Sequence, residues 1–235
     1  MECIILAGGL GTRLKSAVPD LPKCMAPVAG KPFLHYIIEM LLQQNVTRFI
    51  FSLGYKHEYI EAYIQQNYPH IDYVFSIEDE PLGTGGAIRL ACTKTKQDNV
   101  LILNGDTMFN IDLLKLMSFH IQHEAACTLS LKPMHQFDRY GVVELNKDSN
   151  INSFKEKKYY EEGNINGGVY ALNVHNFLKT KFSDKFSFET DYLEKYYSSE
   201  KMMGLIQDSY FIDIGIPEDY ERAGRELPDI EIHKQ

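Results

Sequence analysis

Short apolar runs alternate with amphipathic segments through the first half of the chain. Residue spacing predicts strands at 3–7, 47–53, 71–77 and 99–106, and helices at 33–45, at 57–68 and from about Gly86. This alternation is typical of an α/β fold, in which helices flank a mostly parallel sheet and right-handed crossovers join its strands. In such sheets ligands bind beyond the carboxyl ends of the strands. The glycine-rich loop after the first strand and Asp106 at the end of the fourth therefore belong to the predicted binding edge.

The pattern changes after about residue 125, where strand-like runs predominate. The second half is predicted to contain strands at 126–131, 140–145, 150–154, 165–172, 203–206 and 210–214, with helices at 174–179 and 188–198. No linker rich in Pro, Gly or Ser separates the halves. We therefore expect one domain over residues 1–235, in which a smaller β-rich lobe (about 126–225) folds onto the α/β half (about 1–125).

Composition argues against several classes of protein. The chain has 235 residues and a formal net charge of −8, whereas proteins that bind nucleic-acid polymers present basic surfaces. No apolar stretch approaches the roughly 20 residues of a membrane helix, and the first residues lack the pattern of a signal peptide. The four cysteines are scattered, which favours reduced thiols over a zinc site. We expect a cytoplasmic protein that binds neither nucleic acid nor membrane.

A group of glycines and cations follows the first predicted strand. Gly8, Gly9 and Gly11 leave the backbone bare, so consecutive N–H groups can form a concave site for an anion. Arg13 can hold phosphate oxygens with its planar guanidinium, and Lys23 adds a compact positive charge. These residues predict a phosphate-binding loop.

Two common phosphate motifs fit this loop poorly. The dinucleotide-binding pattern G-x-G-x-x-G fails because Leu14 occupies the place of the third glycine, and the Walker A sequence G-K-[ST] is absent. The plainer alternative to a phosphate site is a glycine-rich turn beside two surface cations.

The spacing of these residues resembles the sugar-1-phosphate nucleotidyltransferases. That family pairs G-G-x-G-T-R-L with a downstream P-K-x-M-x-P-V, and this chain has LAGGLGTRL at 6–14 and PKCMAPVAGKP at 22–32. The similarity extends over roughly residues 2–222 and includes EPLGTGGAI at 80–88, LNGD at 103–106, RYGVV at 139–143, FKEK at 154–157, INGGVY at 165–170 and FIDIGIPEDY at 211–220. Cys24 and Phe211 depart from the more usual Pro and Trp. The resemblance implies a Rossmann-like, mostly parallel sheet of the nucleotide-diphospho-sugar transferase type, with a smaller β-rich lobe that binds the sugar.

For the nucleotide and the metal, the resemblance implies residues of the glycine loop and of later strand ends. The implied nucleotide-binding residues are Leu6, Ala7, Gly8, Gly9, Gly11, Thr12, Arg13, Lys23, Glu78, Pro81, Gly83 and Thr84. Arg13, Lys23 and Asp106 are implied to be catalytic. Asp106 and Asp213 are implied to hold Mg²⁺, although an Asp at a strand end or before a Gly is also common in caps and turns.

For the sugar phosphate, the resemblance implies residues from the second half of the chain and one from the fourth strand. They are Asn104, Tyr140, Gly141, Glu156, Lys157, Asn166 and Gly167. Glu156 would bind sugar hydroxyls and Lys157 the phosphate, while Asn166 and the two glycines would contact the ring. Taken alone, Glu156 and Lys157 also fit a solvated charged edge.

The chemistry of the implied reaction suits this set of residues. A nucleoside triphosphate and a phosphate monoester bring about six negative charges to one site, since each monoester carries roughly −1.5 to −2. Cations on both sides and Mg²⁺ on carboxylates would offset that repulsion. The sugar phosphate is already ionised at neutral pH, so its in-line attack on the α-phosphate needs neither a general base nor a covalent intermediate.

Within the family, the sequence most resembles guanylyltransferases that act on D-glycero-α-D-manno-heptose 1-phosphate, through GKPFLHY, EPLGTGGAI, DRYGVV, INGGVY, FSFETDYL and YFIDIGIPEDY. The resemblance implies GTP, or another nucleoside triphosphate, and a sugar 1-phosphate as substrates, and GDP-heptose for bacterial surface polysaccharide as product. The alternatives are a uridylyl- or thymidylyltransferase for a mannose, glucose or N-acetylmuramate type of sugar phosphate, and a non-catalytic module that senses sugar nucleotides. The sequence leaves the oligomeric state open, a homodimer included.

Glu78, five residues before Gly83, is the residue expected to select the base. Related thymidylyl- and uridylyltransferases tend to have a Gln here, whose amide matches a pyrimidine edge. One carboxylate can accept both the N1–H and the N2 amino group of guanine, so Glu78 predicts a preference for GTP. The alternative is that Glu78 is one more surface acid in the run Glu78 to Glu80.

Overall fold

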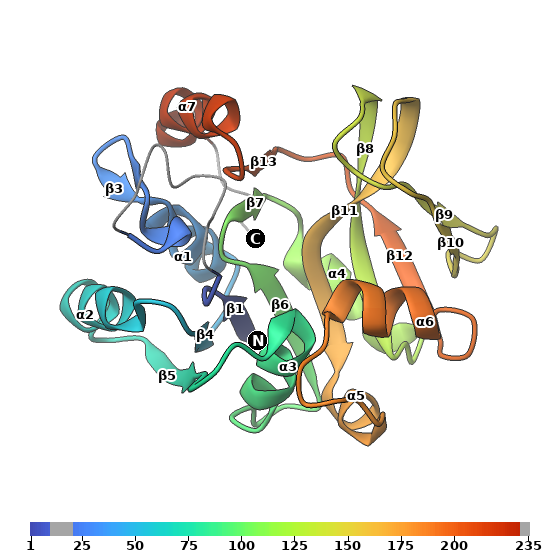
Figure 1. The fold of residues 1–235 in the computed structure, drawn as a ribbon, viewed down its shortest axis with the longest axis horizontal. Helices are drawn as coiled ribbons and strands as arrows, with labels where there is room; N and C mark the ends of the chain where they lie inside the picture. The colour runs from blue at the N-terminus through green and yellow to red at the C-terminus, as the bar shows by residue number, and fades with distance from the viewer. Residues whose placement is uncertain (10–20, 231–235) are drawn as a thin grey trace.

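A seven-stranded sheet forms the centre of the molecule (Figure 1). The computed structural model describes residues 1–9 and 21–230. In spatial order the strands are β12 (Met202–Ile206), β8 (Cys127–Phe137), β11 (Tyr160–Asn173), β6 (Asn99–Asn104), β1 (Glu2–Leu6), β4 (Arg48–Leu53) and β5 (Asp72–Ile77). Neighbouring strands pair in parallel except at β11, which is antiparallel to both β6 and β8. The expected mostly parallel α/β sheet is confirmed.

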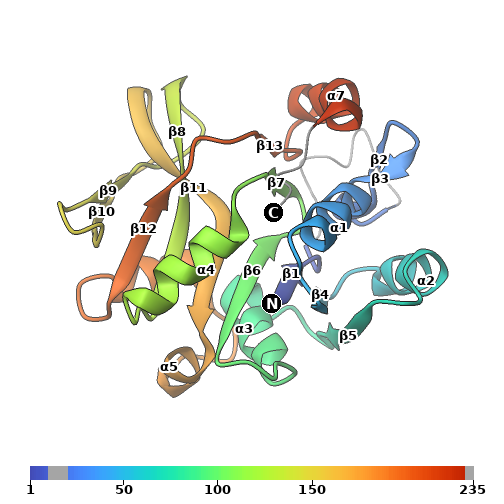
Figure 2. The same ribbon diagram turned by 180° about the vertical axis from the view of Figure 1, so that it is seen from behind.

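Helices cover both faces of this sheet because successive strand residues point to opposite sides. In β1, Cys3 and Ile5 join one buried cluster with α1 (Phe33–Gln43), α2 (His57–Asn67) and α4 (Leu113–Gln122). Ile4 joins a second cluster with α3 (Gly83–Cys92) and α5 (Val174–Lys179). Figure 1 shows α3 in front of the sheet, and Figure 2, from behind, shows α1 and α4 in front. The strands are therefore buried on both faces, which explains their nearly continuous apolar runs.

The other described elements are short. They are η1 (Lys23–Met25), β2 (Pro27–Val28), β3 (Lys31–Pro32), β7 (Thr107–Phe109), β9 (Val143–Leu145), β10 (Ile151–Phe154), η2 (Phe188–Leu193), α6 (Glu194–Tyr196), β13 (Phe211–Asp213), α7 (Pro217–Glu226) and η3 (Leu227–Asp229). Across residues 1–9 and 21–230, no helix combines the length and the apolar character that crossing a bilayer requires.

Two helices, α4 and α7, were not predicted from the sequence. The Asp112 side chain caps α4 by accepting a hydrogen bond from the Lys115 N–H at 2.8 Å, and α4 then buries Leu113, Leu116 and Met117 at helical spacing. In α7, Pro217 stands in the first turn, where its missing N–H costs nothing.

Strands β8 and β11 are longer than predicted because their outer ends pair with each other beyond the central sheet. Tyr160 lies opposite Phe137 at the outer end of this ribbon, which rises above the sheet in Figure 1. The register shifts between Asn166 and Tyr170, and Gly168 there has a φ of 72°, a conformation that favours glycine. Such bulges re-aim side chains, and they are frequent beside active sites.

Candidate active site

A cavity of about 1050 Å³ lies beyond the carboxyl ends of four strands. Its wall includes Ala7 after β1, Gly54 after β4, Glu78 after β5 and Gly105 after β6. These four strands are adjacent and parallel, so their carboxyl ends meet along one edge of the sheet. This is the edge at which open α/β sheets bind their ligands.

Lys23 lies between the two aspartates proposed from the sequence as metal ligands. Its Nζ is 2.6 Å from Asp106 Oδ2 and 3.3 Å from Asp213 Oδ1, and all three residues line the cavity. The Lys23 side chain is 14% exposed, against 38% for Asp106 and 26% for Asp213, so the ammonium is the most enclosed of the three groups. One partly buried cation thus offsets part of the charge of two carboxylates that would otherwise repel each other.

Strand pairing explains how Asp106 and Asp213 meet although they are far apart in the sequence. In the antiparallel pair β7–β13, Asp213 lies opposite Thr107, the residue after Asp106. The Ile214 N–H also donates to the Asp106 carbonyl oxygen at 3.1 Å. The Asp213 Oδ1 accepts from the Gly215 N–H at 2.8 Å, which fixes the carboxylate toward Lys23.

Lys23 belongs to the short helix η1, which is held in place by the packing of its other residues in the core. The next two residues, Cys24 and Met25, are buried in the core cluster that contains α1. Burial, with the Asp106 carboxylate as a second cause, raises the pKa of the Cys24 thiol to about 12. A thiol held neutral in this way is a packing residue at the floor of the site rather than a nucleophile.

Glu78 is a half-buried residue of the cavity wall, not a member of a surface acidic run. Its Oε2 accepts a hydrogen bond from the Leu82 N–H at 2.7 Å, and burial raises the pKa of the carboxyl. Its Oε1 lies so near Gly8 that a Cβ added there would stand 3.1 Å from it. Glu78 therefore faces the glycine loop, while its neighbours Asp79 and Glu80 are exposed.

Twelve residues proposed from the sequence line this one cavity. They are Leu6, Ala7, Gly8, Gly9, Lys23, Glu78, Pro81, Gly83, Thr84, Asn104, Asp106 and Asp213. Three further ones, Gly11, Thr12 and Arg13, lie outside the described residues.

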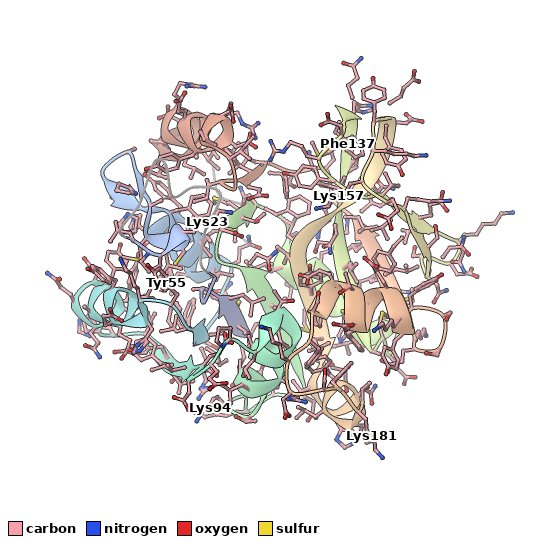
Figure 3. The ribbon with its side chains drawn as sticks, in the orientation of Figure 1. Lys23, Tyr55, Lys94, Phe137, Lys157 and Lys181 are labelled. Atoms are coloured by element: carbon pink, nitrogen blue, oxygen red, sulfur yellow. The ribbon has the colours of Figure 1, made fainter. Side chains whose placement is uncertain are left out.

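The other residues proposed for the sugar phosphate do not line the cavity. Glu156 and Lys157 are exposed, and Figure 3 shows Lys157 beside the β8–β11 ribbon, on the half of the molecule opposite Lys23. Burial raises the pKa of Tyr140 to about 12, with the Asp213 carboxylate as the next cause, so Tyr140 lies near the aspartate pair. Its ring meets Phe211 edge-on, with centroids 6.0 Å apart.

The bulge in β11 brings Asn166 and Gly167 to the same region. Asn166 Nδ2 donates to the Tyr170 hydroxyl at 2.9 Å, and its Oδ1 accepts from the Gly168 N–H at 3.1 Å. A Cβ on Gly168 would stand 2.7 Å from the Nδ2 atom of Asn104, which lines the cavity. Gly141 also packs closely against the backbone of another segment, since a Cβ there would collide with the Lys155 carbonyl oxygen.

Several cavity residues were missed from the sequence. Ser52 is near the carboxyl end of β4, and Tyr55 and His57 follow that strand. The rule that ligands bind at strand ends could have found all three. Glu189, on η2, comes from the second half of the chain and carries no comparable local signal. Among the described residues, no group of three or more His, Cys, Asp or Glu side chains is arranged to hold a metal ion by itself.

Comparison with known proteins agrees with this fold. The family model described as Nucleotidyl transferase matches residues 2–229. The chain is 55% identical, over 97% of its length and 98% of the other, to a protein of Aneurinibacillus thermoaerophilus named D-glycero-alpha-D-manno-heptose 1-phosphate guanylyltransferase. It is 46% identical to a Campylobacter jejuni protein of the same name, over 94% of this chain and 97% of that one.

A solved structure also resembles this protein closely. The structure of HddC from Yersinia pseudotuberculosis complexed with GMP-PN superposes with a TM-score of 0.87 at 40% identity, covering 96% of this chain and 99% of that one. The chain belongs to the nucleotidyl transferase family, and it is a nucleotidyltransferase.

Proposed function

We propose that this chain transfers a guanylyl group from GTP to D-glycero-α-D-manno-heptose 1-phosphate, giving GDP-heptose and pyrophosphate. The observation that carries the proposal is the meeting of Lys23, Asp106 and Asp213 in a cavity at the carboxyl ends of parallel strands. The choice of substrates is supported by 55% and 46% identity, over nearly the full chain, to two proteins named for that reaction.

The two halves of the chain would hold the two substrates within a single domain. Residues of about 1–125 would bind the nucleotide, and residues of about 126–225 the sugar phosphate. The continuous sheet supports a single domain, because β8 and β11 are hydrogen-bonded into the same sheet as β6 and β1. A rigid sheet can hold two phosphate groups in line for attack, and such positioning is a large part of catalysis in phosphoryl transfer.

Charge neutralisation is the main task of the site, because two polyanions must meet there. Lys23 would turn from the two carboxylates toward the phosphates of GTP, and its ammonium would offset charge on the oxygens around the α-phosphate. Asp106 and Asp213 fit Mg²⁺, which typically binds one or two carboxylates together with phosphate oxygens. The bound ion would supply positive charge against the triphosphate. The backbone N–H groups of Gly8 and Gly9, with Gly11, Thr12 and Arg13 by sequence motif, would complete the phosphate cradle, next to Leu6 and Ala7.

Guanine would be read at the side of the cavity formed by Glu78 and the start of α3. The Leu82 N–H holds one carboxylate oxygen of Glu78, which leaves acceptor capacity for guanine N1–H and N2. Pro81, Gly83 and Thr84 stand beside it on the cavity wall. A Cβ at Gly83, whose φ is 73°, would meet the Phe186 carbonyl oxygen, so this turn is closely packed.

The sugar phosphate would enter between Asn104 and the second half of the chain. Tyr140, Gly141, Asn166 and Gly167 would contact the sugar, with Glu156 on its hydroxyls and Lys157 on its phosphate. The proximity of Gly168 to Asn104 supports this placement, because it brings the β11 bulge beside the cavity. Attack by the sugar phosphate would then displace pyrophosphate without a covalent enzyme intermediate.

The decisive experiment is a pyrophosphate-release assay with Mg²⁺ over four nucleoside triphosphates and several sugar 1-phosphates. We expect the highest kcat/KM for GTP with D-glycero-α-D-manno-heptose 1-phosphate. A higher value for UTP or dTTP, or for mannose or glucose 1-phosphate, would overturn the substrate assignment. Absence of pyrophosphate release with every pair would favour a sensing role instead. Asp106→Asn serves as the inactive control.

A further inference from the structure

Glu189 is a carboxylate of the cavity wall that comes from the second half of the chain. It stands on η2, the π-helical segment Phe188–Leu193, which packs against α3 and is continuous with α6. Its side chain is half-buried and lines the same cavity as Lys23. π-helical turns are rare, and they are frequently found at functional sites.

Two hydroxyl groups orient the Glu189 carboxylate. The Thr84 hydroxyl accepts from the Phe188 N–H at 2.8 Å, so its single proton is free to donate to Glu189 Oε2, also at 2.8 Å. The Ser187 hydroxyl accepts from the Thr190 N–H at 3.2 Å and donates to the same oxygen at 3.1 Å. Oε2 is thereby saturated by two donors, whereas Oε1 has no hydrogen-bond donor among the residues that the structure describes.

The lysine of the adjoining helix is already paired. Lys195 of α6 lies 2.7 Å from Asp191 Oδ1. Within the described ranges, no lysine, arginine or histidine nitrogen lies within 4 Å of the Glu189 carboxylate. A half-buried carboxylate without a cation is stabilised by hydrogen bonds from neutral donors, and hydroxyl groups are such donors.

The neighbours of Glu189 include groups that contact residues proposed to bind the sugar. Burial raises the pKa of Tyr170 well above its ordinary value, with the Glu189 charge as the next cause, and the Tyr170 hydroxyl accepts from Asn166. Burial also raises the pKa of Glu194, with Glu156 and then Glu189 as further causes. Tyr170 and Glu194 thus link Glu189 to Asn166 and Glu156, two residues that the family resemblance implies for the sugar.

We propose that Glu189 is a sugar-binding residue, whose Oε1 accepts hydrogen bonds from hydroxyl groups of the sugar 1-phosphate. This inference rests on the proposed function and adds to it a residue that determines affinity for the sugar. Thr84 and Ser187 are positioning residues, because their hydroxyl groups hold Oε2 and leave Oε1 without a donor among the described residues. A sugar is the ligand that fits, since a phosphate beside an unpaired carboxylate would be repelled.

The test compares wild type, Glu189→Gln and Glu194→Gln. Glu194→Gln is the matched control, because it removes the same charge from a neighbouring exposed side chain that does not line the cavity. Initial rates give the KM values for heptose 1-phosphate and GTP, and calorimetry gives the Kd values for GDP-heptose, GDP-mannose and GDP. Thermal unfolding of each variant checks the fold.

We expect Glu189→Gln to raise the KM for heptose 1-phosphate and the Kd for GDP-heptose by roughly ten- to a hundredfold, the usual effect of losing a hydrogen bond to a charged group. The KM for GTP and the Kd for GDP should stay within about twofold, and Glu194→Gln should resemble wild type. A loss for GDP-heptose that GDP-mannose does not share would assign the contact to the C7 hydroxyl. An equal loss would assign it to hydroxyls that both sugars carry.

The possible negative results have different meanings. If the wild-type protein does not transfer a guanylyl group from GTP to heptose 1-phosphate, both the proposed function and this inference are wrong. If the wild type is active but Glu189→Gln leaves the sugar KM and the GDP-heptose Kd unchanged, the inference alone is wrong. A rise confined to the GTP KM, or a lowered Tm with equal losses for all ligands, would show instead that Glu189 only fastens η2 to α3.

Discussion

Replacing His120 of α4 by glutamine should reduce the loss of unfolding free energy that occurs as the pH falls below 6.5. The His120 side chain is 1% exposed, with Nδ1 2.9 Å from Thr128 Oγ1 and Nε2 3.1 Å from Asn99 Oδ1. Because the Asn99 oxygen also accepts from Asn173, we assign the ring proton to Nε2 and the acceptor role to Nδ1. The network thus fits a neutral imidazole, and burial lowers the pKa of His120 from 6.5 to about 4.

The sign and size of the effect follow from this lowered pKa. Above pH 6.5 the ring is neutral in both the folded and the unfolded chain, so it makes no pH-dependent contribution. As the pH falls from 6.5 toward about 4, the unfolded chain binds a proton that the folded protein does not, and the free energy of unfolding decreases. At about 1.4 kcal/mol per pH unit, the loss is about 2 kcal/mol by pH 5 and about 3 kcal/mol once the pH has reached 4.

Urea unfolding at pH 7.5, 6.5, 5.5 and 5.0 measures this loss. His120→Gln cannot titrate, so it should lose about 2 kcal/mol less than wild type between pH 7.5 and 5.0, even if it is less stable throughout. His175→Gln is the control, because His175 is exposed, and it should keep the wild-type slope. Parallel curves for wild type and His120→Gln would refute the assignment of a buried neutral histidine.

Three predictions concern the site. Asp106→Asn and Asp213→Asn should each abolish pyrophosphate release without lowering the Tm. The double variant should be little worse than either single variant, because residues that act as a unit have non-additive effects. Near wild-type rates in a single variant would contradict a shared metal. Glu78→Gln should shift selectivity from GTP toward UTP and dTTP by about tenfold, since an unpaired buried polar group costs about 1 to 3 kcal/mol; an unchanged preference would remove Glu78 from base recognition. Arg13→Ala should lower kcat on the order of 10² to 10³, with partial rescue by Arg13→Lys, and full activity of the Lys variant would show that any cation suffices.

Local sequence patterns determined the α/β half and much of the site. Apolar runs of strand length separated by amphipathic segments predicted β1, β4, β5 and β6 and the helices between them, because burial and backbone periodicity act over a few residues. The rule that ligands bind beyond strand ends then placed the glycine loop and Asp106 at one edge, and the cavity lies there. Motif spacing pointed to Lys23 and Asp213 as well, but it could not say that Lys23 would stand between the two aspartates.

Pairing between distant segments was decided by the tertiary structure alone. The antiparallel insertion of β11 between β6 and β8, and the β7–β13 pair that sets Asp213 beside Thr107, depend on contacts that no local period encodes. Glu189 reaches the cavity for the same reason, since its position follows from the packing of η2 on α3 and from the Thr84 hydroxyl. A sequence lists the side chains that can carry charge or donate hydrogen bonds. Which of them share one cavity depends on long-range packing, because burial free energy rewards any apolar contact without regard to its distance along the chain.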